Sequence, residues 1–209
     1  MLFDALILIG IGFIIGLSGA ILPGPLFAFT VLDTSRKHSV TGHLIIFGHV
    51  VWESIIILII LLGFGTFLIG NKLIIYIIGG SVLLLMGYQM TKSRKEKIIL
   101  KKSNMNSSFL GGIFYTAFNP TQPLWWATAG LSLLLKGMEI MSVLGVIFVT
   151  AGHWLADFVY YIFISFVVRK NENYIAGKQG KLSLILALFV SILGIYFIVS
   201  GLQQTFIVG

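Results

Sequence analysis

The sequence predicts an all-α polytopic membrane protein, with six transmembrane helices in two inverted three-helix repeats and with helices one and four broken. Three observations lead to this prediction. The 209 residues are 57% hydrophobic and only 10% charged, with a mean hydropathy of +1.02, and no soluble domain of this size hides so much apolar surface. The apolar residues form six long runs. The second half of the chain also repeats short motifs of the first.

Each of the six apolar segments is long enough for the roughly 20 residues with which a helix crosses a bilayer. The segments cover residues 4–32, 43–69, 73–91, 108–135, 140–168 and 182–207. They are continuously rich in leucine, isoleucine, valine and phenylalanine, whereas the strands of a membrane barrel alternate in shorter pieces. We therefore expect helices.

Basic residues are distributed unevenly among the connections between these segments. Twelve of the fourteen lysines and arginines fall in the first, third and fifth connections. They are Arg36, Lys37, Lys92, Arg94, Lys95, Lys97, Lys101, Lys102, Arg169, Lys170, Lys178 and Lys181, whereas Lys72 and Lys136 fall in the other two. Because basic loops stay in the cytoplasm, we expect a plasma-membrane protein with both termini extracytoplasmic. The same distribution accounts for the net charge of +7 without a nucleic-acid partner.

A polar connector near the middle divides the chain into two halves of three segments each. We expect a first repeat at residues 1–91, a basic cytoplasmic linker at 92–107 and a second repeat at 108–209. A glycine, a histidine and then a carboxylate occur in order at Gly48 to Glu53, and the pattern recurs at Gly152 to Asp157. Because each half holds three helices, the second copy enters the membrane from the opposite face, as in transporters with inverted repeats.

Two of the segments contain prolines that a continuous helix does not accommodate. Pro23, Gly24 and Pro25 interrupt the first segment, and Pro120 and Pro123 interrupt the fourth. Proline lacks the backbone N–H and crowds the preceding turn. Broken backbone inside a membrane is tolerated only where it is buried in protein or lines a polar cavity, and transporters place binding sites there. We expect the two breaks to border one binding site; a simple proline kink is the alternative.

Two carboxylates lie near the predicted midplane of the bilayer. Glu53 lies about 18 Å of helix rise past Thr41, and Asp157 lies about 18 Å before Arg169. A carboxylate at that depth is costly and should face the interior of the bundle, where it can hold a proton or the ammonium group of a substrate. A hydrogen-bonded clamp between helices is the structural alternative.

A histidine precedes each of these acids by four residues, so each pair shares one helix face. His49 is paired with Glu53 in this way, and His153 with Asp157. The histidines can orient the carboxylates and relay protons. Alternatively, the four side chains can converge on a divalent metal ion, because histidine and carboxylate are common metal ligands.

Other polar and aromatic residues near the breaks have two interpretations each. Asn119 and Gln122 can hydrogen-bond to a substrate or cap the interrupted helix. Trp125 and Trp126 can close over a substrate, although packing is the more common role of such residues. Asp33, beside the basic turn that follows the first segment, is expected to form a solvated pair with an arginine three residues later.

A set of these motifs is shared with a known family. It comprises the proline–glycine–proline element, the basic turn after it, spaced glycines, the asparagine–proline pair, and an acid followed three positions later by an aromatic residue. The residues are Pro23, Gly24, Pro25, Ser35, Arg36, Lys37, Gly42, Gly48, Gly63, Gly79, Gly80, Gly87, Asn119, Pro120, Asp157 and Tyr160. Over most of its length the chain thus resembles the LysE/RhtB amino-acid exporters. Two features depart from that pattern: Thr121 stands where a lysine often follows the asparagine–proline pair, and the His49/Glu53 pair is not typical.

The resemblance implies a secondary transporter that exports cationic or small neutral amino acids at the expense of the proton gradient, with a homodimer as a further implication. The expected partners are a small-molecule substrate, protons and the lipid bilayer. Divalent-cation transport by the histidine and carboxylate pairs is the alternative function. We expect neither enzymatic activity nor a cofactor, because no hydrolase motif is recognisable. The absence of cysteine excludes disulfides and thiolate chemistry.

Overall fold

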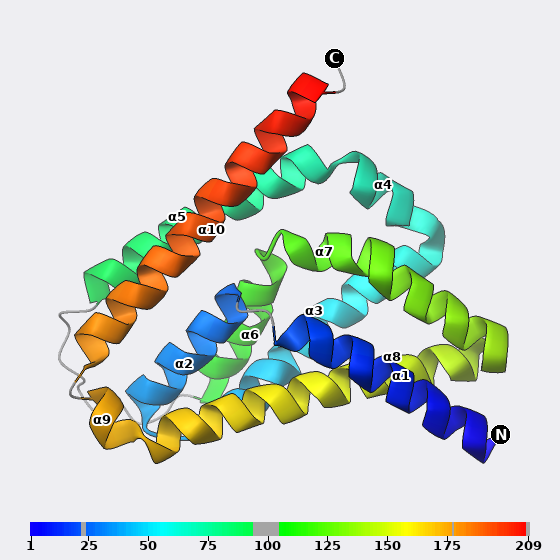
Figure 1. Ribbon diagram of the computed structural model, residues 1–209, viewed down its shortest axis with the longest axis horizontal. Coiled ribbons are helices and arrows are strands. Elements are labelled where there is room, and N and C mark those ends of the chain that lie inside the picture. The colour runs from blue at the N-terminus through cyan, green and yellow to red at the C-terminus, as the bar shows by residue number, and fades with distance from the viewer. Residues whose placement is uncertain (22–23, 94–104, 177, 208–209) are drawn as a thin grey trace.

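In the computed structural model, the described residues (1–21, 24–93, 105–176 and 178–207) fold into helices joined by short turns. In chain order the elements are α1 (Leu2–Ala20), α2 (Pro25–Lys37), α3 (Gly42–Ile59), η1 (Ile60–Phe64), α4 (Gly65–Gly70), α5 (Lys72–Ser93), α6 (Met105–Ala117), α7 (Thr121–Trp125), η2 (Trp126–Gly130), α8 (Leu131–Lys170), α9 (Glu172–Ala176) and α10 (Gln179–Ile207) (Figure 1). The symbol η marks a π-helical segment. The all-α prediction is confirmed for these residues.

Four helices within the described ranges are long and apolar enough to cross a membrane. They are Leu2–Ala20, Gly42–Phe64, Thr121–Lys170 and Gly180–Gln203, and Leu73–Gln89 in α5 is a shorter apolar helix. A helical membrane protein is thereby supported, whereas the number of six spans stays a prediction. Most of the predicted linker, residues 94–104, lies outside the described part of the chain.

Both predicted helix breaks are present. Helix α1 ends at Ala20 and α2 begins at Pro25, with extended Gly24 as its N-cap. A proline is well placed as the first residue of a helix, since the N–H it lacks has no intrahelical partner there. In the fourth segment, α6 ends at Ala117 and α7 begins at Thr121.

The chain reverses direction between the fourth and fifth predicted segments, but at a different position from the predicted one. The two segments, 108–135 and 140–168, were expected to be separated at residues 136–139, but the first helix runs a few residues further, and α8 consists of two helices joined across a kink. The non-helical dihedrals fall at Met141 (φ −138°, ψ 22°) and Ser142 (φ 54°, ψ −141°), after the predicted loop rather than in it.

Glycines mark this reversal and the bend in the second segment. A Cβ atom built on Gly137 would lie 2.6 Å from the carbonyl oxygen of Gly145, so the two arms of the kink meet backbone to backbone. In η1 the chain bends at Gly63, whose φ of 92° is disfavoured for any residue with a side chain. The predicted segment 43–69 is therefore two helices at an angle.

The closest helix pairs are α1 with α8, α3 with α6, and α5 with α10, and the last pair runs along one edge of the molecule (Figure 1). Glycines allow these approaches. A Cβ atom on Gly12 of α1 would overlap the carbonyl oxygen of Val149 in α8, and one on Gly48 of α3 would overlap that of Phe109 in α6. Backbones this close fix the rotation of each helix and so decide which side chains face the interior.

Candidate functional site

A cavity of about 260 Å³ lies where the two helix breaks come together. Its lining includes Gly24 and Pro25 at the first break and Asn119 and Gln122 at the second, with further residues from α1, α3, α8 and α10. Both breaks therefore border one cavity, and its role as a binding site stays a prediction. Among the described residues that line it, the only ionisable groups of acid or histidine type are those of the predicted pairs; Tyr161 adds a phenol.

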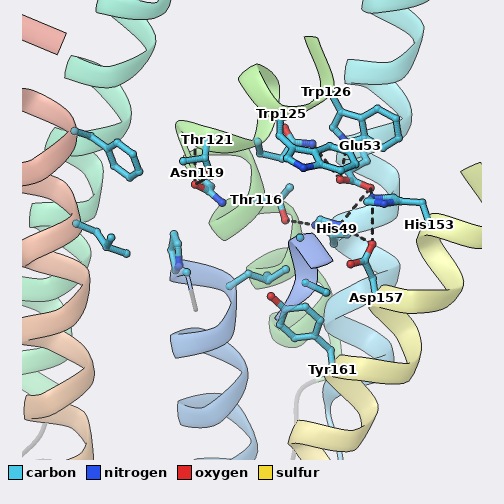
Figure 2. Close-up of a pocket in the computed structure, with 18 residues that line it drawn as sticks. His49, Glu53, Thr116, Asn119, Thr121, Trp125, Trp126, His153, Asp157 and Tyr161 are labelled. Carbon is cyan, nitrogen blue, oxygen red and sulfur yellow. Dashed lines mark hydrogen bonds and ion pairs between the residues drawn. The ribbon is translucent and has the colours of Figure 1, made fainter. Parts of the chain in front are cut away.

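The four predicted ionisable side chains converge in this cavity, and all four are buried (Figure 2). Nε2 of His49 lies 3.3 Å from Oε2 of Glu53 and 3.5 Å from Oδ2 of Asp157. Nε2 of His153 lies 3.3 Å and 3.4 Å from the same two oxygens. One donor atom from each residue falls within 4.8 Å of the other three. We call these four residues the central cluster.

The carboxylate of Glu53 is held by nitrogen donors from three other elements, α7, η2 and α8. Oε1 accepts hydrogen bonds from Nε1 of Trp126 at 2.7 Å and from Nε2 of Gln122 at 3.4 Å, and Oε2 accepts one from Nε1 of Trp154 at 3.0 Å. Donors of this kind favour the ionised form of a carboxylate. They also tie α3 to the second helix break, because Trp126 and Gln122 lie directly after it.

The tautomer of His49 follows from its second contact. Oγ1 of Thr116 donates its proton to the carbonyl oxygen of Gly112 at 2.7 Å, so it accepts a hydrogen bond from Nδ1 of His49, 2.9 Å away. With a proton on Nδ1, the other ring nitrogen faces the two carboxylates. That nitrogen either carries a second proton or presents a lone pair to negative oxygens, which is repulsive. The central cluster is therefore stable only with protons or another cation in it.

Several buried polar atoms of the cluster have no hydrogen-bond partner within the described part of the chain. They are Nε2 of His49, both ring nitrogens of His153, and Oδ2 of Asp157. Apart from Nδ1 of His153, these atoms contact the opposite groups of the cluster at 3.3–3.5 Å without hydrogen-bond geometry. Because buried polar atoms without hydrogen bonds are costly, their concentration at one cavity indicates a place where ligands or cations bind. The ring of Trp125 stacks on that of His153 with centroids 5.0 Å apart, which leaves the imidazole edge facing the acids.

The remaining predicted residues have separate roles. Oδ1 of Asn119 accepts hydrogen bonds from the backbone N–H and the hydroxyl of Thr121, so Asn119 lines the cavity and also orders the start of α7. Pro120 directly precedes α7 and packs against α5, where a Cβ atom on Gly79 would lie 2.8 Å from the proline ring. Pro123 was expected to interrupt the fourth segment together with Pro120, but it lies inside α7, which begins at Thr121. Pro23 lies outside the described residues.

Sequence reasoning missed two features. Trp154 had no assigned role, yet it contacts Glu53; its position next to His153 in the repeated motif was the available signal. Asp33 was expected to be solvated beside an arginine, which is wrong. It is buried, its Oδ1 lies 2.9 Å from Nζ of Lys37, and its Oδ2 accepts a hydrogen bond from Ser108 at 2.7 Å.

A helical membrane protein in which two interrupted helices meet at a buried, ionisable cavity belongs to the class of membrane transporters. The chain is a member of the LysE type translocator family, which it matches over residues 17–201. This match confirms the resemblance predicted from the sequence motifs. No curated protein and no solved structure matches the chain significantly.

Proposed function

We propose that this translocator exports an amino acid, or a similar small cationic or zwitterionic metabolite, across the plasma membrane in exchange for protons. The observation that carries the proposal is the central cluster, with its two buried carboxylates and two histidines at the edge of a cavity between broken helices. Membership of a translocator family supports the transport itself.

The proton-coupling part of the proposal follows from the charges in the cavity. With both histidines protonated, the two imidazolium groups balance the two carboxylates. An arriving ammonium group competes for the same carboxylate oxygens, and it binds at the expense of the protons. Protons and substrate therefore exclude each other from one site, which is the minimum that exchange requires.

The helix breaks provide a complementary place for a substrate carboxylate. The first N–H groups of α2 have no partner within their own helix, and its N-terminal residues Gly24, Pro25 and Leu26 line the cavity. The positive end of a helix dipole attracts negative charge. An amino acid can thus place its carboxylate at α2 and its ammonium group at Glu53 or Asp157.

The inverted repeat of six spans is part of the proposal, and the packing supports it. In the proposed repeat, α1 of the first half corresponds to α6 of the second half, and α3 corresponds to the later part of α8. The α1–α8 contact then corresponds to the α6–α3 contact, and both are close pairs. The repeated motif behaves alike in both: Gly48 meets the backbone of α6, Gly152 meets the backbone of α1, and the histidine after each glycine enters the central cluster. Gly80 and Gly194, from the third helices, face each other.

The experiment uses purified protein in proteoliposomes loaded with radiolabelled lysine, threonine or leucine, under an imposed pH gradient. Gradient-driven efflux of at least one amino acid is expected. Asp157→Asn should abolish driven efflux, since it removes a titratable group, but should leave amino-acid exchange measurable. Glu139→Gln is the matched control, because Glu139 is exposed on the same helix and pairs with Lys136. Unchanged driven efflux in both Asp157→Asn and Glu53→Gln would contradict the mechanism.

A second candidate function is the transport of a divalent cation. The observation that favours it is the clustering of two imidazole nitrogens and two carboxylate oxygens within 4.8 Å. The hydrogen bonds from His49 to Thr116 and from the tryptophans to Glu53 resemble the outer-shell contacts that orient metal ligands.

Calorimetry with Zn²⁺ and Mn²⁺ separates the two functions. A metal cargo predicts binding that weakens as the pH falls, because the ligands must lose protons, and that His49→Ala abolishes. It also predicts that metal flux, and no amino-acid flux, appears in the proteoliposomes. Absence of saturable metal binding to the purified protein would eliminate this candidate.

A further inference from the structure

Away from the central cluster, four helices are joined by buried polar side chains in a single layer. Asp33, Thr34 and Lys37 contribute from α2, Thr41 from the start of α3, Ser108 from α6, and Ser165 from α8. We call these six residues the polar layer. None of them takes part in the function proposed above, and their contacts are between helices that also form the cavity.

One half of the layer joins α2 to α6. Oδ2 of Asp33 accepts the Ser108 hydroxyl at 2.7 Å, and Oδ1 pairs with Nζ of Lys37 at 2.9 Å. Nζ of Lys37 also donates to Ser107 at 2.7 Å and to Ser108. The Asp33 and Lys37 side chains are only 9% and 12% exposed, so this is a buried, hydrogen-bonded ion pair.

The other half joins α2, α3 and α8. Oγ of Ser165 accepts hydrogen bonds from the backbone N–H groups of Thr41 and Gly42, at 2.8 Å and 3.1 Å, and so caps the first turn of α3 from a different helix. Oγ1 of Thr34 lies within hydrogen-bonding distance of both Ser165 and Thr41, at 3.0 Å and 2.8 Å. Gly42 permits this approach, because a Cβ atom there would overlap the carbonyl oxygen of Tyr161.

The layer lies at one depth below the cavity. Four of its residues are each eight or nine positions, or about 12 Å of helix rise, from a residue that lines the cavity. The corresponding pairs are Asp33 with Gly24, Thr41 with His49, Ser108 with Thr116, and Ser165 with Asp157. The layer is on the side of the basic turn at Arg36 and Lys37 and of the basic end of α8.

We propose that the polar layer is the gate of the transporter on its basic, cytoplasmic side, closed in this structure. Five of its members are buried and the Lys37 side chain is only 12% exposed, so side chains fill the space between the cavity and that face. For the cavity to open there, the α2–α6 and α2–α8 contacts must separate together. Side-chain hydrogen bonds suit this task, since water can replace each of them when the helices part, whereas interdigitated apolar packing gains nothing from water.

The first test is the accessibility of a cysteine in the cavity, and the chain has no native cysteine to interfere. Thr121→Cys places a thiol at the exposed rim of the cavity lining. A membrane-impermeant methanethiosulfonate reagent is applied to the cytoplasmic face of inside-out vesicles. Adding Asp33→Asn should raise the labelling rate from that face by about fivefold, the population shift expected from the loss of one hydrogen bond. This readout needs no knowledge of the substrate.

Ser35→Ala is the matched control in the same reporter background. Ser35 is buried on α2, but its hydroxyl bonds to the Leu32 carbonyl of its own helix. The Ser35→Ala variant should leave the labelling rate unchanged. Ser108→Ala should raise the labelling rate, as Asp33→Asn does. An equal rise in Ser35→Ala and Ser108→Ala would show general loosening of α2 and overturn the gate, as would no rise in either layer variant.

Crosslinking gives a second measurement, which does not require the Thr121→Cys variant of the first test to fold correctly. In Thr34→Cys/Ser165→Cys, oxidation should form a bond between α2 and α8, because the native oxygens are 3.0 Å apart. Adding Ser108→Ala should slow this reaction in proportion to the closed population that is lost, and so by less than the fivefold rise in labelling. A rate insensitive to Ser108→Ala would show that the two halves of the layer do not separate together, contrary to the proposal.

Discussion

At the scale of single residues, Glu53 is the most strongly positioned member of the central cluster. Its two oxygens accept hydrogen bonds from Trp126, Trp154 and Gln122, and Oε2 also faces both histidines. Oδ2 of Asp157 also faces both histidines, at 3.5 Å and 3.4 Å, but it accepts no hydrogen bond within the described residues. The two acids are thus held differently: three nitrogen donors position Glu53, whereas the two histidines position Oδ2 of Asp157.

The first prediction concerns the Trp126 donor. Trp126→Phe removes the 2.7 Å hydrogen bond to Glu53 from a fully buried position, and it should lower the free energy of unfolding by about 1.5–3 kcal/mol, as for hydrogen bonds to charged groups. Trp52→Phe is the control, because Nε1 of Trp52 is buried without a partner among the described residues and loses no such bond. Thermal unfolding in detergent measures both, and equal losses would show that Trp126 contributes packing alone.

At the scale of elements, the helices are positioned by glycines whose environments differ sharply. Gly10 and Gly12 are both in α1, yet only Gly12 meets another backbone, since a Cβ atom there would overlap the carbonyl oxygen of Val149. No atom of another residue lies within 4 Å of such a Cβ on Gly10. One turn further along, Gly16 faces His153 in the same way, so this interface also sets the position of a cluster residue.

The second prediction tests that interface. Gly12→Ala should push α1 away from α8 and cost about 1–3 kcal/mol, the range for overpacking a filled core. Gly10→Ala should be neutral or stabilising, since alanine is the better helix former and the site is open. Denaturant titration of the two variants side by side is the measurement. A stable Gly12→Ala variant would mean that the two helices are not in close contact.

The third prediction concerns the bend at Gly63. Because its φ is 92° and no atom of another residue lies within 4 Å of a Cβ there, Gly63→Ala should destabilise through backbone conformation alone, by about 1–2 kcal/mol. Gly70→Ala, also in open space but without the positive φ, serves as the control and should cost less. If the two variants unfold at the same temperature, the bend does not constrain the chain.

At the scale of the whole molecule, the orientation in the membrane follows from the basic loops. Lys170→Cys, at the basic end of α8, should react with an impermeant thiol reagent from the cytoplasm, as the positive-inside rule requires. Glu139→Cys, near the kink toward the other end of the same element, should react from outside. Whole cells compared with inside-out vesicles provide the measurement. Labelling of both positions from one face would contradict the predicted span count.

The sequence alone predicted the helix breaks and the central cluster, because their physical cause is local. Proline interrupts a helix wherever it falls, and a carboxylate in an apolar run must find an interior partner. The reversal at Met141–Ser142 was not predictable in this way. Lys136 was assigned to a connection between segments, yet it forms an i,i+3 ion pair of 2.9 Å with Glu139 on a helix surface, which stabilises the helix instead.

Contacts between helices that are distant in sequence explain the remaining differences between the sequence-based predictions and the structure. The burial of Asp33 depends on Ser108, which is 75 positions away, and on the approach of α6 to α2. The bond from Trp154 to Glu53 depends on the distance between α8 and α3, which close glycine contacts determine. Neither pattern is visible in hydropathy or local spacing, since both arise only when the bundle assembles.

The charge content of the cavity also bears on how tightly transport is coupled. Apart from the central cluster, no lysine, arginine, aspartate, glutamate or histidine lines the cavity within the described part of the chain. A carrier that lost its protons and took up no cargo would hold two bare anions in a medium of low dielectric constant, a state of high free energy. Under the exchange mechanism proposed above, such a carrier is not expected to cross back empty. The same buried acids would then suppress slippage, the wasteful return without cargo or protons.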